Sequence, residues 1–117
     1  MALDDKFAVG PNDELRLDAQ GRVVIGGGAP VTGLRFGTVA VDPGSLAAGA
    51  AADTDVTVAG LTTSDKVFAA APADLEDGLV LVAASVPAAD TLRIRLLNTS
   101  AGAIDGASKS LAYLAVR

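Results

Sequence analysis

The chain has 117 residues, of which 50% are hydrophobic and 20% charged, and its formal net charge at pH 7 is −5. It contains no cysteine and no histidine, which excludes disulfides, zinc sites of the usual kind and catalytic systems built on a cysteine nucleophile or a histidine base. The length suits one domain with its own core and is too short for two.

The positive charges are few and dispersed. The nine Lys and Arg residues stand singly except at Arg93 and Arg95, whereas binding to a polyphosphate needs clustered cations. No run of about 18 apolar residues is present, and the segment from Met1 to Lys6 lacks the basic and then apolar plan of a signal peptide. We therefore expect no nucleic acid partner, no membrane partner and synthesis in the cytoplasm.

The apolar residues are mostly small. Only 3% of the residues are aromatic, although the mean hydropathy is +0.44. A chain of this size leaves much of its surface outside the core, so an apolar composition must either expose apolar patches or bury them against partners. We expect burial against partners. The alternative is that the alanines merely coat the surface of a soluble domain.

A short hairpin is predicted near the N-terminus. Residues 14–25 consist of two short strand-like runs around a turn at residues 19–21. Because an isolated two-stranded hairpin is marginally stable in water, it must lie against another surface. We expect Val23, Val24 and Ile25 to be partner-contact residues that touch another chain, so that Val24→Asp should weaken assembly while the rest of the chain stays folded.

Three consecutive glycines at positions 26–28, followed by Pro30, break the chain after this hairpin. The run lacks the helix and the lysine that would follow in a phosphate-binding loop, so a flexible joint is the favoured interpretation. The predicted organisation is an N-terminal arm and hairpin with a glycine-rich hinge over residues 1–30, and an oligomerisation body over residues 31–117.

From residue 34 onward, short apolar runs alternate with turn residues. Runs that recur every ten to fifteen residues or so are typical of an antiparallel sandwich or barrel. The predicted fold class is therefore all-β, with an antiparallel β-sandwich or small barrel-like body and an N-terminal arm or β-hairpin. Residues 45–52 are predicted as a loop, 72–78 as a single helical turn and 98–106 as a polar turn region. The expected strands cover residues 34–41, 54–58, 66–71, 79–86, 91–96 and 110–116.

Two of these runs differ in pattern. The run 79–86, LVLVAASV, is apolar on both faces, whereas an antiparallel strand with one solvent face should alternate. We therefore expect it to be covered on both faces, either at the centre of the sandwich or in a subunit interface. The run 91–96 alternates cleanly. Its inward side chains are predicted to be Leu92, Ile94 and Leu96, and its outward ones Thr91, Arg93 and Arg95.

Two pairs of charged residues share strand faces in the predicted body. Asp53 and Asp55 stand two residues apart, as do Arg93 and Arg95. We favour cross-strand pairing between the acids and the arginines, which contributes a few tenths of a kcal/mol or so per exposed pair. The alternative is that the arginines contact a partner surface.

No other side chains suggest a chemical site. Asp74, Glu76 and Asp77 do not form the pattern of a calcium-binding loop. Phe36 and Phe68 are too dispersed for a stacking platform, and we expect both rings in the core. No catalytic residue, cofactor site, cofactor or metal site is predicted, so the chain is not expected to be an enzyme.

Five pieces of the chain occur in an order and spacing that point to a known class of proteins. They are VAVDPGSLAAG (39–49), DVTV (55–58), PADLEDGL (72–79), AADTLRIRL (88–96) and NTSAGAID (98–105). With them, residues 34–117 resemble small structural proteins of tailed bacteriophages and prophages. Such proteins are capsid decoration (cement), head-fibre or tail-associated proteins, built as β-sandwiches and often trimeric.

The resemblance implies a virion structural protein. In this interpretation the chain is a capsid decoration protein that forms a homotrimer, binds the major capsid protein and stabilises the capsid surface, with the N-terminal segment used for attachment. The alternative is a tail-fibre or tail-associated binding module that recognises a host surface glycan. The scarcity of aromatic residues weighs against that alternative, because sugar rings stack on aromatic side chains.

Overall fold

The computed structural model describes residues 15–17, 19–25 and 28–117. Within these residues all regular structure is β, and the pairings with a stated register are antiparallel. The predicted all-β class with antiparallel sheets is confirmed. The strands are β1 (Leu15–Leu17), β2 (Val23–Ile25), β3 (Leu34–Val41), β4 (Gly44–Leu46), β5 (Ala51–Thr57), β6 (Lys66–Ala70), β7 (Leu79–Ala88), β8 (Thr91–Asn98), β9 (Ile104–Gly106) and β10 (Lys109–Val116).

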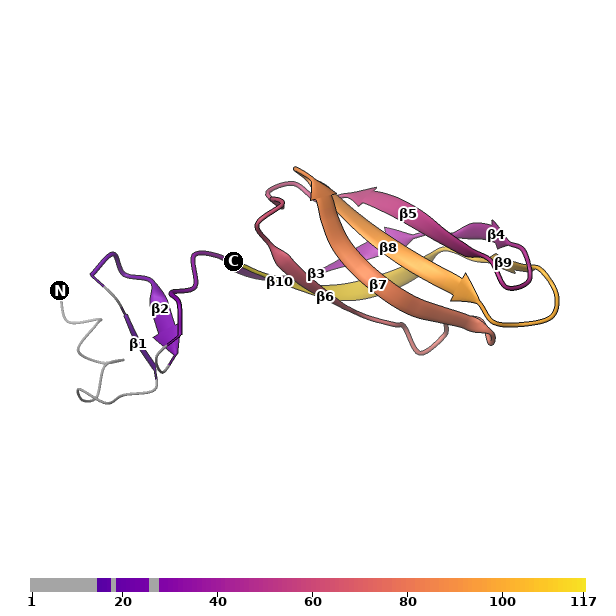
Figure 1. The fold of residues 1–117 in the computed structure, drawn as a ribbon, viewed down its shortest axis with the longest axis horizontal. Helices are drawn as coiled ribbons and strands as arrows, with labels where there is room; N and C mark the ends of the chain where they lie inside the picture. The colour runs from indigo at the N-terminus through magenta and orange to yellow at the C-terminus, as the bar shows by residue number, and fades with distance from the viewer. Residues whose placement is uncertain (1–14, 18, 26–27) are drawn as a thin grey trace. The chain divides into compact units, whose positions relative to one another are not determined.

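The chain divides into two compact units (Figure 1). We call the first the hairpin unit; it comprises Met1–Leu34 and Val116–Arg117. Its strands β1 and β2 pair in the predicted hairpin, and a further bridge joins Val23 to Val31. Gly33 and Arg117 exchange two backbone hydrogen bonds of 2.9 Å. Gly26 and Gly27, the first two residues of the predicted hinge, lie outside the described residues.

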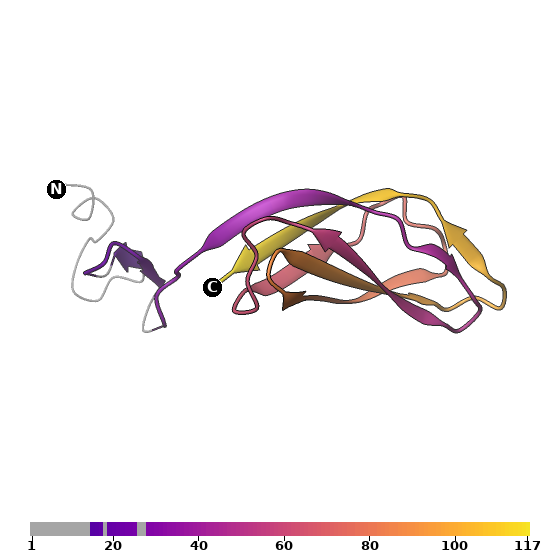
Figure 2. The same cartoon turned by 90° about the horizontal axis from the view of Figure 1, so that it is seen from above.

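The second unit, Arg35–Ala115, is the body. It contains two three-stranded sheets, ordered β3-β10-β6 and β5-β8-β7, and a small two-stranded sheet of β4 and β9. The two views in Figures 1 and 2 show β3 running beside β10, and β8 lying between β5 and β7. This arrangement is compatible with the predicted sandwich body.

The core lies on the inward faces of β8 and β10. Leu92 and Ile94 are fully buried and Leu96 is 3% exposed, which confirms the inward face predicted for residues 91–96. On β10 the buried side chains alternate in the same way, because successive side chains of a strand point to opposite faces. The remaining buried apolar residues of the core are Val41, Leu46, Val58, Leu61, Leu79, Leu111, Tyr113 and Ala115.

Three predicted connections differ from the observed structure. The segment 45–52, predicted as a loop, contains most of β4 and the start of β5, and the polar region 98–106 contains β9. Alanine has a low strand propensity, so the alanine-containing segments were not predicted as strands. The short strands β4 and β9 form because they pair with each other. Residues 72–78 form successive turns in place of a helical turn.

Strand β7 is an edge strand, so a central position for residues 79–86 is wrong. Its pairing with β8 shifts between Leu81 and Ala83, which is a β-bulge or similar irregularity. Such a shift changes which residues face inward: Leu79 and Leu81 lie inward before it, and Ala84 and Val86 after it. The other face of the strand, which includes Val80 and Val82, is exposed in the single chain.

Candidate functional site

The body exposes four large apolar side chains among its described residues. Phe36 is 75% exposed, Phe68 62%, Val82 46% and Val80 43%. The prediction that Phe36 and Phe68 lie in the core is therefore wrong. A contiguous exposed apolar surface on a small domain usually marks a binding site for another macromolecule.

The alternation of β3 explains why Phe36 points outward. Val39 and Val41 turn toward the core, and side chains at odd and even positions of a strand face opposite sides. Inside the sandwich, the space next to Gly37 is filled by the ring of Tyr113. The aromatic side chain of this part of the core is thus supplied by β10, and Phe36 is left on the outer face.

A shallow apolar hollow lies between the two exposed phenylalanines. Phe36 comes from one edge strand of its sheet and Phe68 from the other, with β10 between them. Tyr113 is the only residue lining the hollow whose side chain carries a polar atom, and it is 7% exposed. The lining residues are Phe36, Phe68, Ala69, Ala70, Ala112, Tyr113 and Leu114.

A second hollow continues from the first around the rim of the body. It lies between β6 and β7, which are edge strands of different sheets. Phe68 and Ala69 line both hollows, so the two form one surface. The residues of the second hollow are Val67, Phe68, Ala69, Leu81, Val82, Ala83 and Ala84. We call the combined surface, marked by Phe36, Leu114, Phe68 and Val82, the apolar corner.

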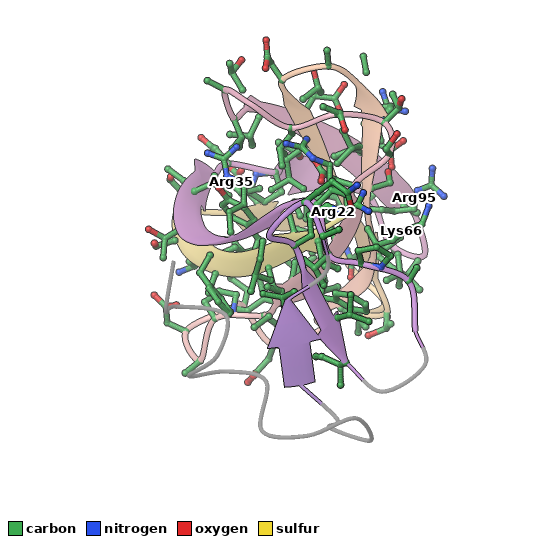
Figure 3. All side chains as sticks on the ribbon, turned by 90° about the vertical axis from the view of Figure 1, so that its left-hand side faces the viewer. Arg22, Arg35, Lys66 and Arg95 are labelled. Carbon is green, nitrogen blue, oxygen red and sulfur yellow. The ribbon has the colours of Figure 1, made fainter. Side chains whose placement is uncertain are left out.

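The outer face of the other sheet is charged. In the pairing of β5 with β8, Asp53 stands opposite Arg95 and Asp55 opposite Arg93. Each arginine donates two hydrogen bonds to its carboxylate: Arg93 at 2.7 and 2.9 Å, and Arg95 at 2.6 and 3.1 Å. The predicted cross-strand pairing is confirmed, and the Arg95 side chain can be followed away from the ribbon in Figure 3.

These contacts change the proton affinities of the four groups. The hydrogen bonds from Arg95 lower the pKa of Asp53, and those from Arg93 lower the pKa of Asp55. The pKa of each arginine is raised by the hydrogen bonds to its carboxylate. All four groups are therefore charged at neutral pH and satisfied by one another, which favours a solvated face.

Two acidic side chains, Asp74 and Glu76, lie close to the side-chain amine of Lys109. Lys109 Nζ lies 3.1 Å from Glu76 Oε1 and 3.7 Å from Asp74 Oδ2. Glu76 Oε1 also accepts a hydrogen bond from the backbone N–H of Ala107. The hydrogen bond between Lys109 and Glu76 lowers the pKa of Glu76 and raises the pKa of Lys109. Within the described residues, no group of three or more acids could hold a metal ion.

The three predicted partner-contact residues differ in exposure. Val24 is 3% exposed, Val23 37% and Ile25 62%. The buried side chain of Val24 cannot meet a second chain unless the single chain rearranges, whereas Ile25 is available. Contact of these residues with another chain stays a prediction.

No protein-family model matches the chain, and no match was found among curated proteins or among solved structures. The part of the chain that the structure describes contains no helix with the length and apolar character needed to cross a bilayer.

Together these surfaces offer area for contact and few placed polar groups. The apolar corner offers contact area and almost no polar groups, and the paired strands β5 and β8 carry a neutralised ladder of charges. Sequence patterns identified the charged ladder because clean alternation marked its strands. They missed the apolar corner, whose signal was the position of Phe36 out of phase with Val39 and Val41.

Proposed function

We propose that this chain is a non-catalytic structural protein of a tailed-phage virion, a decoration (cement) protein that binds copies of itself and the major capsid protein on the capsid surface. The observation that supports this proposal is the apolar corner, where Phe36 and Phe68 remain 75% and 62% exposed. The residues that resemble phage structural proteins support the virion assignment.

The energetics of the corner suit association. With about 200 Å² for a whole phenylalanine side chain, the two rings expose roughly 270 Å², and burying that area contributes about 7 kcal/mol of gross hydrophobic free energy. The entropy lost on association cancels much of this term. The two rings therefore drive contact only as part of a larger interface, as in a protein that binds at many equivalent positions of a shell.

The charged ladder supports the same proposal. A protein on the surface of a shell needs one face for protein contacts and another for solvent. The outer face of the β5 and β8 pair, with Arg93 and Arg95 paired to Asp55 and Asp53, is suited to solvent. The two requirements are thus met by different parts of one body: the apolar corner along β10, β6 and β7, and the charged face of β5 and β8.

The test is a comparison of virus particles made with and without this protein. The gene is deleted from the phage or prophage that carries it, and particle survival is measured after heating and after a change in salt concentration. We expect complete particles to survive better, and an antibody against this chain to label the capsid surface. Equal survival of the two particle types would exclude a cementing role.

A second candidate function is recognition of a host glycan by a tail-fibre or tail-associated module. The exposure of Phe36 and Phe68 favours it, because sugar rings stack on aromatic faces. The composition of the hollow opposes it: only Tyr113 brings a polar atom, whereas sugar sites need several placed hydrogen-bonding groups. Selective binding on a glycan array that is lost in Phe36→Ala would favour this candidate.

A further inference from the structure

We propose that the apolar corner is the docking surface for a second copy of this chain, and that the two copies meet corner to corner about a two-fold axis. This inference rests on the proposed function and assigns one of its partners to a defined surface. It leaves the hairpin unit, with Ile25 exposed, for contact with the shell.

The distribution of exposed apolar side chains favours a symmetric contact. Among the described residues of the body, three of the four large exposed apolar side chains, Phe36, Phe68 and Val82, line the corner, and the fourth, Val80, lies two residues from Val82 on β7. Leu34, the first residue of β3, is 60% exposed and belongs to the hairpin unit. A head-to-tail contact between bodies would need a second, different apolar patch on the body. Since Val80 is the one large exposed apolar side chain that the described body carries outside the corner, the surface most complementary to the corner is the same corner of another copy.

The absence of charge in the corner also favours its meeting itself. In a two-fold contact each group near the axis lies close to its own copy, so any charge there meets a like charge, which is costly. No residue lining either hollow of the corner carries a charge. On a chain with a net charge of −5, the two hollows thus form a neutral surface through which two copies can approach. An adjoining hollow is lined by Asp65 and Lys66, whose charges are opposite in sign.

The area of the corner agrees with a reversible dimer. The two rings expose roughly 270 Å², if a whole ring side chain has about 200 Å², and a standard interface buries about 800 Å² on each partner. Val82 and Leu114, with the alanines that line the two hollows, add to the area of the rings. An interface at the lower end of the specific size range is typical of transient contacts, so we expect a dissociation constant on the order of micromolar.

The test is sedimentation equilibrium of the purified full chain over roughly 1 to 500 µM, a range that brackets a micromolar Kd. We expect a monomer–dimer equilibrium. Phe68→Ser, at the junction of the two hollows, should raise the Kd at least about 30-fold, as expected for a central interface residue. Ile25→Ser is the matched control, because Ile25 and Phe68 are both 62% exposed, and it should leave the Kd unchanged. Far-UV circular dichroism verifies that both variants are folded.

A mixing experiment tests the symmetry. Phe68→Glu and Phe68→Lys should each be monomeric alone, because a like charge would meet itself near the axis, whereas their mixture should form a heterodimer. A monomer at all concentrations, a trimer, a Kd unchanged in Phe68→Ser, weakening by Ile25→Ser, or no recovery in the mixture would each overturn the proposal.

The outcome is separable from that of the proposed function. Dimerisation is measured without particles, and cementing is measured as particle survival. A dimer together with unchanged particle survival would leave this inference standing and remove the cement role. A monomer that still protects particles would overturn the dimer and leave the cement role standing.

Discussion

Gly37 on β3 and Tyr113 on β10 approach so closely that a Cβ atom on Gly37 would lie 2.7 Å from both Cε1 and the hydroxyl oxygen of Tyr113. The interior side of β3 thus has room for a tyrosine ring only where β3 has no side chain. The same packing leaves Phe36, the neighbour of Gly37, on the outer face.

Gly37→Ala should therefore destabilise the body. The added methyl group must displace the Tyr113 ring within a packed interior, which costs about 1–3 kcal/mol. The measurement is urea unfolding followed by near-UV circular dichroism, for which Tyr113 is the sole tyrosine reporter. Gly102→Ala is the control, since nothing lies within 4 Å of a Cβ at that position. Equal stability of the two variants would contradict the packing described for Tyr113.

Asn98 should be the polar side chain whose removal costs most. It is fully buried, donates hydrogen bonds to the carbonyl oxygens of Leu46 and Gly102, and accepts two from Ser100. Asn98→Ala leaves buried groups without partners, so we expect a loss of about 2–4 kcal/mol in the free energy of unfolding.

The comparison for Asn98 is its neighbour Thr99. The Thr99 hydroxyl is exposed and donates one hydrogen bond, to the Gly78 carbonyl. Thr99→Ala should cost no more than about 1.5 kcal/mol. Chemical denaturation of the two variants measures the difference, and an Asn98→Ala variant no less stable than Thr99→Ala would show that the buried network contributes little.

Asp90 should tolerate asparagine better than alanine. Its φ angle is 61°, and its Oδ1 accepts a hydrogen bond of 2.8 Å from the backbone N–H of Gly60. Asparagine adopts this left-handed conformation more readily than most residues and keeps an acceptor. Asp90→Ala loses both advantages, so we expect it to cost about 1–2 kcal/mol more than Asp90→Asn in urea unfolding. The same stability for both would refute this role.

The charged ladder should make stability sensitive to acid. The pKa values of Asp53 and Asp55 are lowered in the folded chain, so the unfolded chain binds more protons as the pH falls. The stabilisation is present above the ordinary value of 3.8 and is lost as the pH falls through the lowered folded values. Replacing both acids with asparagine should lower the melting temperature slightly at pH 7 and flatten its decline below about pH 4.

A matched acid identifies the source of that effect. Asp105 is exposed and lies outside the ladder, on β9. Asp105→Asn removes a negative charge from the same body and should leave the acid-dependent decline in melting temperature as steep as in the unmodified chain. A similar flattening in Asp105→Asn would attribute the effect to net charge and not to the arginine pairs.

The sequence predicted those parts of the fold in which one pattern dominates. The alternation of β8 was sufficient to assign Leu92, Ile94 and Leu96 to the core and to pair Arg93 and Arg95 with Asp55 and Asp53. Strands of this kind carry their orientation in their own residues, because only one face can be buried without burying charge.

The apolar corner could not be predicted in the same way. In β6, the adjacent residues Val67 and Phe68 are both apolar, so the sequence alone does not decide which of the two faces inward. In β7 the irregular register near Val82 changes the inward phase, which no periodic pattern signals. The orientation of these side chains is decided by packing against other strands, so size and hydrophobicity gave the wrong answer for Phe36 and Phe68.

Ile25 provides the sharpest test of the hairpin unit. Val24→Asp no longer isolates an assembly contact, because Val24 is 3% exposed and a buried unpaired carboxylate would disrupt its own unit. Ile25→Asp places the same charge on a side chain that is 62% exposed, so the single chain should fold as before. If the hairpin attaches the protein to the shell, Ile25→Asp should reduce binding to particles that lack the protein by at least about tenfold, as expected for a charge in an apolar contact.

The measurement is co-sedimentation of the purified variant with such particles. Val82→Ser, which alters the apolar corner, is the control and should retain most of the binding of a single copy at concentrations below the dimer Kd. The near-UV signal of Tyr113 reports whether the body of each variant is intact. Undiminished binding of Ile25→Asp would remove the hairpin from the attachment contact and direct attention to the body, because the charge would then stand where no partner surface covers it.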